Sequence, residues 1–306
     1  MIYDLAIIGA GPAGLSASVY ASRYGIKNIV VGEVGGGLAM STHEIGNWLG
    51  SQKVSGFEFA KNAIDHASSL GAEIRSLSVD QIEKKDGEFG ILLSDGSEIS
   101  AKTLLLSMGT KRRKLGVSGE KDFAGKGVSY CSTCDGFFYK DKIVAVVGGG
   151  DSAASAAVYL ANIAKKVYLI YRGDKLRAER FWVDAMENNP NVEIIYNTNV
   201  KEIKGNEKVE KIELDMPING VSEIVIDGLF VEIGLSPNTE MLKNMDIEMD
   251  DEGYIKIDSD GRTSVNGIWS AGDITNGSSK FRQIVTAASE GAIAANSINV
   301  YLNRQK

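Results

Sequence analysis

The two cysteines of the chain, Cys131 and Cys134, are separated by two residues. Three interpretations of this spacing are open: half of a zinc site, two unlinked core thiols, or a redox-active dithiol. Zinc would need two further ligands, and His43 and His66 lack the short spacing of such ligands. A CxxC spacing permits a small-ring disulfide and a reactive thiolate, which favours the redox interpretation. The carboxylate of Asp135 follows directly and is predicted to shuttle protons during thiol exchange; an ordinary acid at a helix N-terminus is the alternative.

A glycine-rich segment near the N-terminus reads Gly9-Ala10-Gly11-Pro12-Ala13-Gly14. Its first glycine permits a tight turn, its second lets a pyrophosphate approach the backbone, and its third lets a helix pack against a strand. The N-terminus of that helix then favours phosphate. Glu33 follows about twenty residues later, where an acid suits a ribose hydroxyl. The pattern predicts a site for an adenosine without a 2′-phosphate, as in FAD or NAD.

A second copy of this motif reads Gly148-Gly149-Gly150-Asp151-Ser152-Ala153, with alanine in the third glycine position. The position equivalent to Glu33 is occupied by Arg172. An arginine there can bind a 2′-phosphate that an acid would repel, and Arg177 can add to the site. The second motif therefore favours NADP(H). A solvated surface charge is the alternative interpretation of Arg172.

A further feature lies toward the C-terminus, where an expected strand from Gly267 runs into Ala271-Gly272-Asp273, followed by Arg282 and Gln283. This order predicts a carboxylate near a helix start, where it can accept a hydrogen bond from a ribityl hydroxyl and where the helix favours negative charge on a reduced flavin. The alternative is a plain strand-to-helix turn with a capping acid.

Both glycine motifs need a strand before them and a helix after them. The expected elements are a strand at 3–8, a helix to about residue 24 and a strand at 29–31, repeated without gaps as a strand at 143–147, a helix from 154 to about 164 and a strand at 167–171. Two such units predict an α/β fold with two Rossmann-like three-layer domains. Runs at 77–82 and 89–93, and at 212–216 and 224–231 around Asn219-Gly220, predict β-hairpins.

Short glycine-rich or polar stretches near Gly116 and Pro237 predict the domain boundaries. The first domain would then comprise residues 1–115 and 238–306, and residues 116–237 would form a second domain inserted into it, carrying the CxxC motif.

Composition sets the broad class. The 306 residues are 43% hydrophobic and 24% charged, with 33 basic and 40 acidic side chains and a net charge of −7. An acidic chain is a poor candidate for nucleic-acid binding, because neutralising phosphates needs a basic face. The first residues lack a signal-peptide pattern, and the longest apolar stretch, 143–164, is interrupted by glycines and Asp151. We therefore expect a cytoplasmic enzyme with no nucleic-acid or membrane partner.

Together these residues resemble the low-molecular-weight thioredoxin reductases over essentially the whole chain. The CxxC motif with its trailing Asp-Gly-Phe-Phe, just upstream of the second glycine motif, carries most of the resemblance. Other matching segments are Gly35-Gly36, Glu44 to Trp48, Met108-Gly109-Thr110 and Arg282-Gln283.

The resemblance implies FAD in the first domain, NADPH in the second, no metal, and a homodimer. Cys134 would face the flavin, Cys131 would attack the disulfide of thioredoxin or of a thioredoxin-like or glutaredoxin-like protein, and Asp135 would move protons. The residues expected to hold FAD are Gly9, Gly11, Pro12, Ala13, Gly14, Glu33, Gly36, Asn47, Gly109, Gly272, Asp273, Arg282 and Gln283. Those expected to hold the nicotinamide nucleotide are Gly148, Gly150, Asp151, Ser152, Ala153, Arg172 and Arg177.

The chain departs from the family pattern at two places. The family signature His-Arg-Arg-x-x-x-Arg reads Tyr171-Arg172-Gly173-Asp174-Lys175-Leu176-Arg177 here, and Gly37-Leu38 replaces the usual Gln after Gly-Gly. Losing one charged phosphate contact costs about 1.5–3 kcal/mol. NADH, ferredoxin or another donor, a dithiol oxidase activity and a non-catalytic FAD-binding protein therefore remain as alternatives.

Overall fold

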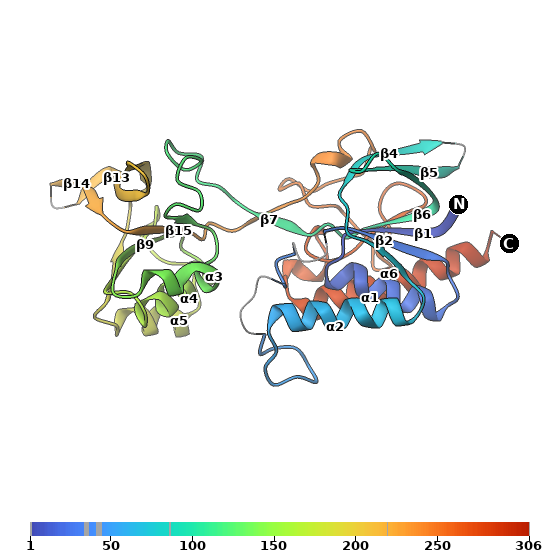
Figure 1. Cartoon of the computed structure of the whole chain (residues 1–306), viewed down its shortest axis with the longest axis horizontal. Coiled ribbons are helices and arrows are strands. Elements are labelled where there is room, and N and C mark those ends of the chain that lie inside the picture. The colour runs from blue at the N-terminus through green and yellow to red at the C-terminus, as the bar shows by residue number, and fades with distance from the viewer. Residues whose placement is uncertain (1, 34–36, 41–44, 86, 219, 306) are drawn as a thin grey trace. The chain divides into compact units, whose positions relative to one another are not determined.

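The computed structural model describes residues 2–33, 37–40, 45–85, 87–218 and 220–305. The chain divides into two compact units (Figure 1): unit 1 comprises residues 1–111 and 236–306, and unit 2 comprises residues 112–235. Both divisions fall a few residues before the predicted boundaries, and the assignment of a cofactor to each domain stays a prediction. No helix of the described residues is long and apolar enough to cross a bilayer.

Unit 1 is built on a sheet with the strand order β3-β2-β1-β6-β5-β4, and β17 also pairs with β6. Its strands are β1 (Ile2–Ile8), β2 (Asn28–Val31), β3 (Glu73–Arg75), β4 (Val79–Lys85), β5 (Glu88–Leu93), β6 (Glu98–Leu106) and β17 (Ile268–Ser270). Its helices are α1 (Pro12–Arg23), α2 (Gly56–Ser69) and α6 (Ile284–Asn303). Figure 1 shows α1 and α6 side by side under the sheet. The β4–β5 hairpin forms one end of the same sheet and packs over the opposite face of β1.

Alternation of side chains along β1 explains these layers. Leu5 and Ile7 pack into one apolar cluster with alanines of α1 and α6, whereas Ala6 and Ile8 belong to a second cluster that contains Phe89 of β5. Successive residues of a strand point to opposite faces, so a strand covered on both faces is apolar throughout. This is why the run 3–8 reads as continuously hydrophobic.

Strand β6 has a divided edge. Its first half pairs antiparallel with β5, as in Phe89 opposite Ala101, and its second half pairs parallel with β17, as in Ile268 opposite Leu104. The opposite edge of β6 pairs with β1 along its length. The sheet of unit 1 therefore includes a strand from the C-terminal segment of the chain.

Unit 2 contains a parallel sheet in the order β11-β10-β9-β15-β8 and an antiparallel sheet in the order β12-β13-β14. The strands are β8 (Val128–Ser129), β9 (Ile143–Val147), β10 (Lys166–Ile170), β11 (Val192–Ile195), β12 (Val200–Gly205), β13 (Val209–Ile218), β14 (Val221–Val225) and β15 (Gly228–Val231). The helices are α3 (Ser132–Asp135), α4 (Asp151–Ala161) and α5 (Arg180–Glu187). Two further strands, β7 (Thr110–Arg112) and β16 (Leu235–Pro237), pair with each other.

The predicted internal repeat is confirmed. β1-α1-β2 of unit 1 and β9-α4-β10 of unit 2 are both strand, glycine turn, helix and parallel strand. Each central strand also pairs on its other edge with a later strand, β6 in unit 1 and β15 in unit 2. This order places the glycine turn at the carboxyl edge of the sheet, where nucleotides bind in such folds.

One predicted strand was wrong. The run 224–231 is two strands, because Asp227 interrupts it. The carboxylate of Asp227 accepts the N–H of Ile143 at 2.9 Å, and its own N–H donates to the Ile143 carbonyl at 2.7 Å. The chain therefore leaves the antiparallel sheet after β14 and enters the parallel sheet as β15. The β4–β5 hairpin is confirmed, and β4 begins at Val79 rather than at Leu77.

Candidate active site

The glycine turn of unit 1 accepts only glycine at two positions. Gly9 has a φ of +115°, and a Cβ there would lie 2.3 Å from the Ser107 carbonyl oxygen. A Cβ on Gly14 would lie 2.0 Å from the carbonyl oxygen of Gly9. Gly11, in contrast, has open space where a Cβ would stand, and Pro12 is the first residue of α1. The turn therefore holds the helix close to the strand and leaves the backbone at Gly11 accessible.

The N-terminus of α1 is suited to an anion. In the described residues 11–15, no side chain caps the helix and the first turn holds no acid. The free N–H groups of a helix start carry a partial positive charge. Exposed Glu33 follows Gly32. A Cβ added to Gly32 would lie only 2.6 Å from the nitrogen of Ala10, so this segment lies against the glycine turn. The predicted ribose acid is thus held next to the predicted phosphate turn.

Gly272 and Asp273 lie against the first turn of α1. A Cβ on Gly272 would lie 2.9 Å from the Cβ of Ala13 and 3.6 Å from that of Ala287 in α6. Burial raises the pKa of the Asp273 carboxyl above its ordinary value, and the positive charge of Arg282 opposes this shift. The expected helix is therefore close in space, although it begins only at Ile284. The Asp273 carboxyl thus lies near a helix start as predicted, and the alternative of a plain strand-to-helix turn with a capping acid is wrong, because ten residues separate Asp273 from α6 and its N-cap is Gln283.

Arg282 supplies polar atoms that no described residue satisfies. Its Nε and Nη2 are buried and donate no hydrogen bond to any of these residues, and Oγ1 of Thr110 likewise has no partner among them. Its guanidinium lies 4.1 Å from the ring centroid of Tyr254, and Nη1 donates to the Lys280 carbonyl at 3.4 Å. A buried polar group without a hydrogen bond costs about 1–3 kcal/mol. A bound ligand with acceptor oxygens would remove that cost, so these residues fit an anionic dinucleotide.

The remaining predicted FAD residues are distributed around this region. Asn47 Nδ2 donates to Gln283 Oε1 at 2.9 Å, and Gln283 is the N-cap of α6. Gly109 has a φ of +60° and accepts the N–H of Asn238 at 3.1 Å. Gly36, together with Gly35, His43 and Glu44, lies outside the described residues.

Sequence reasoning missed Glu290. Its carboxylate accepts the N–H of Gly272 at 2.8 Å and the hydroxyls of Thr275 and Ser278 at 3.0 and 2.6 Å. It thereby ties the segment that carries Asp273 to α6. The available signal was that Glu290 is the one charged residue of that helix.

The glycine turn of unit 2 has the same construction. Gly148 has a φ of +148°, and a Cβ there would lie 2.2 Å from the Glu232 carbonyl oxygen and 2.7 Å from the Cβ of Ala153. Gly150 is the N-cap of α4 and has open space at its Cβ position. Asp151 and Ser152 open the helix and are exposed, and the Asp151 carboxylate accepts the N–H of Glu179 at 2.7 Å.

Basic residues lie beside this second turn. The N–H of Arg177 donates to the carbonyl of Gly149 at 2.7 Å, which holds the segment 171–177 next to the turn. Arg172 and Arg177 are exposed, and neither side chain forms an ion pair with another described residue. The ring of Tyr171 lies between two glycines: a Cβ on Gly149 would be 2.2 Å from the ring, and one on Gly173 would be 2.8 Å from it. A side chain at position 173 would therefore require the Tyr171 ring to move.

The two cysteines form a disulfide at the start of α3. This confirms the dithiol interpretation and contradicts the zinc and unlinked-thiol alternatives. Cys131 is the half-buried N-cap of α3, and its Sγ accepts the N–H of Cys134 at 3.2 Å. Cys134 is exposed. A hydrogen bond to sulfur favours the anionic form of a thiol, so after reduction Cys131 is the better placed nucleophile.

Asp135 is linked to the cysteines through Ser129. The Ser129 hydroxyl donates to Asp135 Oδ2 at 2.6 Å and accepts the N–H of Cys131 at 3.1 Å. Burial, together with the negative charges of Asp135 and Asp227, raises the pKa of the nearby Tyr139 hydroxyl. The predicted proton carrier therefore lies in the same small network as the redox pair, within the single turn of α3.

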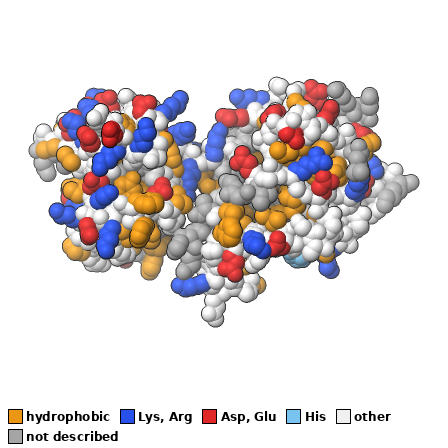
Figure 2. All heavy atoms as spheres, viewed as in Figure 1, with side chains coloured by type: hydrophobic (Ala, Val, Ile, Leu, Met, Phe, Trp, Pro, Cys, Tyr) orange, Lys and Arg blue, Asp and Glu red, His pale blue; other side chains and the backbone are white. Residues whose placement is uncertain are grey.

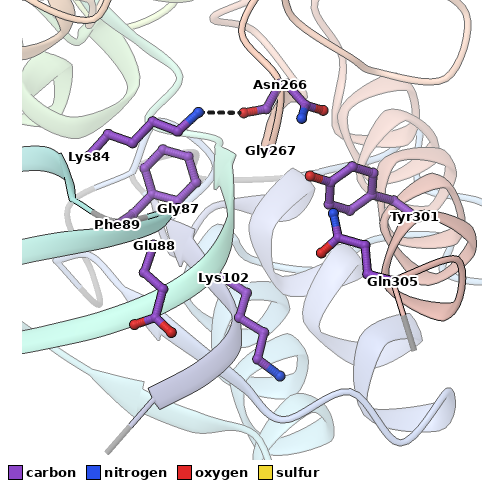
Figure 3. Close-up of a pocket in the computed structure, with 9 residues that line it drawn as sticks. All are labelled: Lys84, Gly87, Glu88, Phe89, Lys102, Asn266, Gly267, Tyr301 and Gln305. Atoms are coloured by element: carbon purple, nitrogen blue, oxygen red, sulfur yellow. Dashed lines mark hydrogen bonds between the residues drawn. The ribbon is translucent and has the colours of Figure 1, made fainter.

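A pocket of about 440 Å³ lies elsewhere on unit 1 (Figure 3). It is lined by residues of β4, β5, β6 and the C-terminal end of α6, among them Lys84, Phe89, Lys102 and Tyr301. Lys84 donates to the Asn266 carbonyl at 3.2 Å, and Lys102 pairs with Asp4 at 2.8 Å. None of the predicted site residues lines it, so it is separate from the chemistry described above.

Comparison with known proteins agrees with this geometry. The family model for pyridine nucleotide-disulphide oxidoreductases matches residues 3–291. A thioredoxin reductase of Helicobacter pylori is 42% identical, with 98% of both chains covered. The crystal structure of Lactococcus lactis thioredoxin reductase is 33% identical, with a TM-score of 0.90 and 99% of both chains covered. A ferredoxin-flavin thioredoxin reductase from Clostridium acetobutylicum is 32% identical, with a TM-score of 0.54 and 99% of both chains covered.

The resemblance expected from the sequence is therefore confirmed, together with the α/β fold of Rossmann-like units. The chain belongs to the pyridine nucleotide-disulphide oxidoreductase family, among its low-molecular-weight thioredoxin reductases.

Proposed function

We propose that this chain passes electrons from NADPH through FAD and the Cys131–Cys134 pair to thioredoxin or to a thioredoxin-like or glutaredoxin-like protein. The observation that carries the proposal is the disulfide on α3. It belongs to the same unit as the second glycine turn, beside which lie the exposed Arg172 and Arg177, neither of them paired with an acid of the described residues. The full-length similarity to thioredoxin reductases supports the same activity.

Unit 1 is the proposed FAD site. Its support is the accessible N-terminus of α1, the partnerless buried nitrogens of Arg282, and the placement of Asp273 beside both. When bound, FAD supplies a two-electron carrier between the nicotinamide and the cysteines. In this proposal the α1 N–H groups bind the pyrophosphate, Glu33 binds a ribose hydroxyl, and Asp273, Asn47 and Gln283 orient the remainder.

Thiol exchange follows from the two cysteines. Once the disulfide is reduced, Cys131 Sγ attacks one sulfur of the partner's disulfide. The partner's S–S bond breaks, and its leaving sulfur takes a proton. Cys134 Sγ then attacks Cys131 Sγ in the mixed disulfide, which re-forms the Cys131–Cys134 bond and releases the second sulfur of the partner as a thiol. Asp135, held by Ser129, is the proposed carrier of these protons.

The surface next to the disulfide suits a protein partner. Phe137 and Phe138 directly follow the cysteine motif and are 74% and 69% exposed. Exposed aromatic side chains of this size are typical of protein-binding surfaces. Figure 2 shows hydrophobic side chains among charged side chains of both signs on the visible face of the molecule. We also propose the homodimer and the cytoplasmic location implied by the resemblance; light scattering of the purified protein tests the first.

An anaerobic titration of the flavin absorption band tests the donor. NADPH is expected to bleach the flavin, and the Cys134→Ser variant is expected to bleach as well but to leave thioredoxin oxidised. If neither NADPH nor NADH bleaches a flavin that dithionite reduces, the nicotinamide part of the proposal fails. Reduction by ferredoxin in that case would support the second candidate, which the similarity to the Clostridium acetobutylicum enzyme and the loss of one arginine at Gly173 favour.

A further inference from the structure

A buried ion pair lies next to the redox helix. Glu232 directly follows β15, and its side chain is only 8% exposed. Nη1 of Arg112 lies 3.1 Å from Glu232 Oε2 and donates a hydrogen bond to it. Both residues belong to unit 2. Neither is part of the flavin, nicotinamide or thiol chemistry described above.

Glu232 also lies beside the start of α3. β15 pairs in parallel with β8, with Phe230 opposite Ser129, so Glu232 and Cys131 follow neighbouring strands at the same level. Ser132 is buried and is the first residue of α3, directly after Cys131. Its N–H and hydroxyl are close enough to the Glu232 carboxyl to oppose the rise in the pKa of that carboxyl.

The backbone of Glu232 is equally constrained. Its N–H donates to the Val147 carbonyl at 2.9 Å, at the end of β9. Its carbonyl oxygen is the atom that a Cβ on Gly148 would approach to 2.2 Å. Glu232 therefore joins three parts of unit 2: the end of β9, the nucleotide turn and the redox helix. Because Glu232 is held in this way, we expect it to restrict the positions that Cys131 can take.

The charges of the pair are balanced. Burial raises the pKa of the Glu232 carboxyl, whereas Arg112 and the N–H and hydroxyl of Ser132 oppose that shift. Removing one partner of a buried ion pair leaves an uncompensated charge. Because a thiolate on α3 is negative, an unbalanced carboxylate would oppose its formation and an unbalanced guanidinium would favour it.

We propose that Glu232, paired with Arg112 and lying beside Ser132, is a positioning residue that sets the equilibrium between the disulfide and dithiol forms of Cys131–Cys134. The inference rests on the proposed redox cycling of these cysteines, but on neither the electron donor nor the protein partner.

The test equilibrates the FAD-loaded protein with mixtures of reduced and oxidised dithiothreitol under anaerobic conditions at pH 7. In this exchange the protein S–S bond breaks and takes up two electrons and two protons, while dithiothreitol loses both and closes to its cyclic disulfide. Acid quenching, alkylation and mass measurement then report the fraction of Cys131 and Cys134 in the dithiol form, independently of the flavin.

Glu232→Gln keeps an oxygen acceptor beside Ser132 but leaves Arg112 unbalanced. We expect its equilibrium constant to shift about tenfold toward the dithiol, equivalent to about 30 mV. Arg112→Met is expected to shift it toward the disulfide, and the double variant is expected to return within about threefold of the parent. Glu213→Gln is the matched control, because Glu213 is an ion-paired acid of unit 2 bound to Lys201 and Lys204 in the antiparallel sheet.

The outcomes separate a positioning role from a structural one. Lower melting temperatures with equilibrium constants within twofold of the parent would overturn the inference. If Glu232→Gln does not fold, Ser132→Ala serves instead, since it removes the hydroxyl beside the Glu232 carboxyl and keeps both charges. It is expected to shift the equilibrium two- to threefold toward the dithiol, and an unchanged value would also overturn the inference. Cysteines of the parent protein that never cycle would refute the proposed function itself.

Discussion

Tyr171 contacts Gly173, so we expect these two positions together to determine how strongly the chain prefers NADP⁺ to NAD⁺. Gly173→Arg restores the second arginine of the family signature. A new charged contact with a 2′-phosphate would contribute about 1.5–3 kcal/mol. However, a Cβ at 173 would lie 2.8 Å from the Tyr171 ring, and a ring that moves away from it moves toward the backbone at Gly149, which is already so close that only glycine fits there. Overpacking of this kind costs about 1–3 kcal/mol.

Because the gain and the cost are of equal size, Gly173→Arg alone is expected to leave NADP⁺ affinity within a few-fold of the parent. Tyr171→His introduces a smaller ring that lacks Cζ and the hydroxyl oxygen, the two atoms that would lie 3.0 and 3.1 Å from a Cβ at position 173. The double variant is therefore expected to bind NADP⁺ about ten- to a hundredfold more tightly. NAD⁺ carries no 2′-phosphate, so its affinity should fall in Gly173→Arg, where the displaced Tyr171 ring crowds the nucleotide turn, and return close to the parent value in the double variant.

Isothermal titration calorimetry with NADP⁺ and NAD⁺ measures these affinities without turnover, and thermal unfolding measures the overpacking. Gly173→Ala is the matched control, since it adds the same Cβ without a charge and should lower both the melting temperature and the affinity for NADP⁺ and NAD⁺. A tenfold or larger gain for Gly173→Arg alone, at an unchanged melting temperature, would refute the reasoning.

Three further predictions concern other parts of the chain. Cys134→Ser is expected to lower thioredoxin reduction in a coupled assay by about a thousandfold or more, and retention of activity would contradict the resolving role. Glu290→Ala leaves the N–H of Gly272 and the hydroxyl of Ser278 without their acceptor, while the Thr275 hydroxyl keeps the Gly272 carbonyl. FAD affinity, followed by flavin fluorescence, should fall about tenfold or more, whereas Glu83→Ala on the β4–β5 hairpin should leave it unchanged. The pKa of Glu213 is lowered from 4.5 to about 2 by hydrogen bonds from Lys201 and Lys204, so its stabilisation is present above pH 4.5 and is lost as the pH falls toward 2. Glu213→Gln should flatten the thermal stability profile in that window, and a profile parallel to the parent's would count against this.

The elements around the glycine turns could be predicted because strand, glycines and helix follow one another directly in the sequence, and the apolar run of β1 follows from burial on both faces. The collisions that require Gly9 and Gly148 are with the distant carbonyls of Ser107 and Glu232, and only the structure shows them. The cysteine pair could also be predicted from the sequence, because its spacing alone brings the two sulfurs together.

The supporting residues could not be predicted, because their partners are set by tertiary structure. Glu232 meets Ser132 only because Asp227 directs the chain from the antiparallel into the parallel sheet, and nothing in the sequence near residue 227 announces that change. Glu290 likewise binds Gly272 across a separation of 18 positions. The spacing of a motif therefore identifies its reactive residues but not the distant residues that position them.

The divided edge of β6 has a consequence for synthesis on the ribosome. The second half of β6 pairs with β17, at residues 268–270, so that edge stays open until almost nine-tenths of the chain has been made. Unit 2, which ends at residue 235, leaves the ribosome earlier. During that interval Leu104, Leu105 and Leu106 form an unpaired apolar edge, which is a template for pairing with other chains. A nascent chain of this enzyme should therefore depend on chaperones most strongly after unit 2 has folded and before β17 arrives.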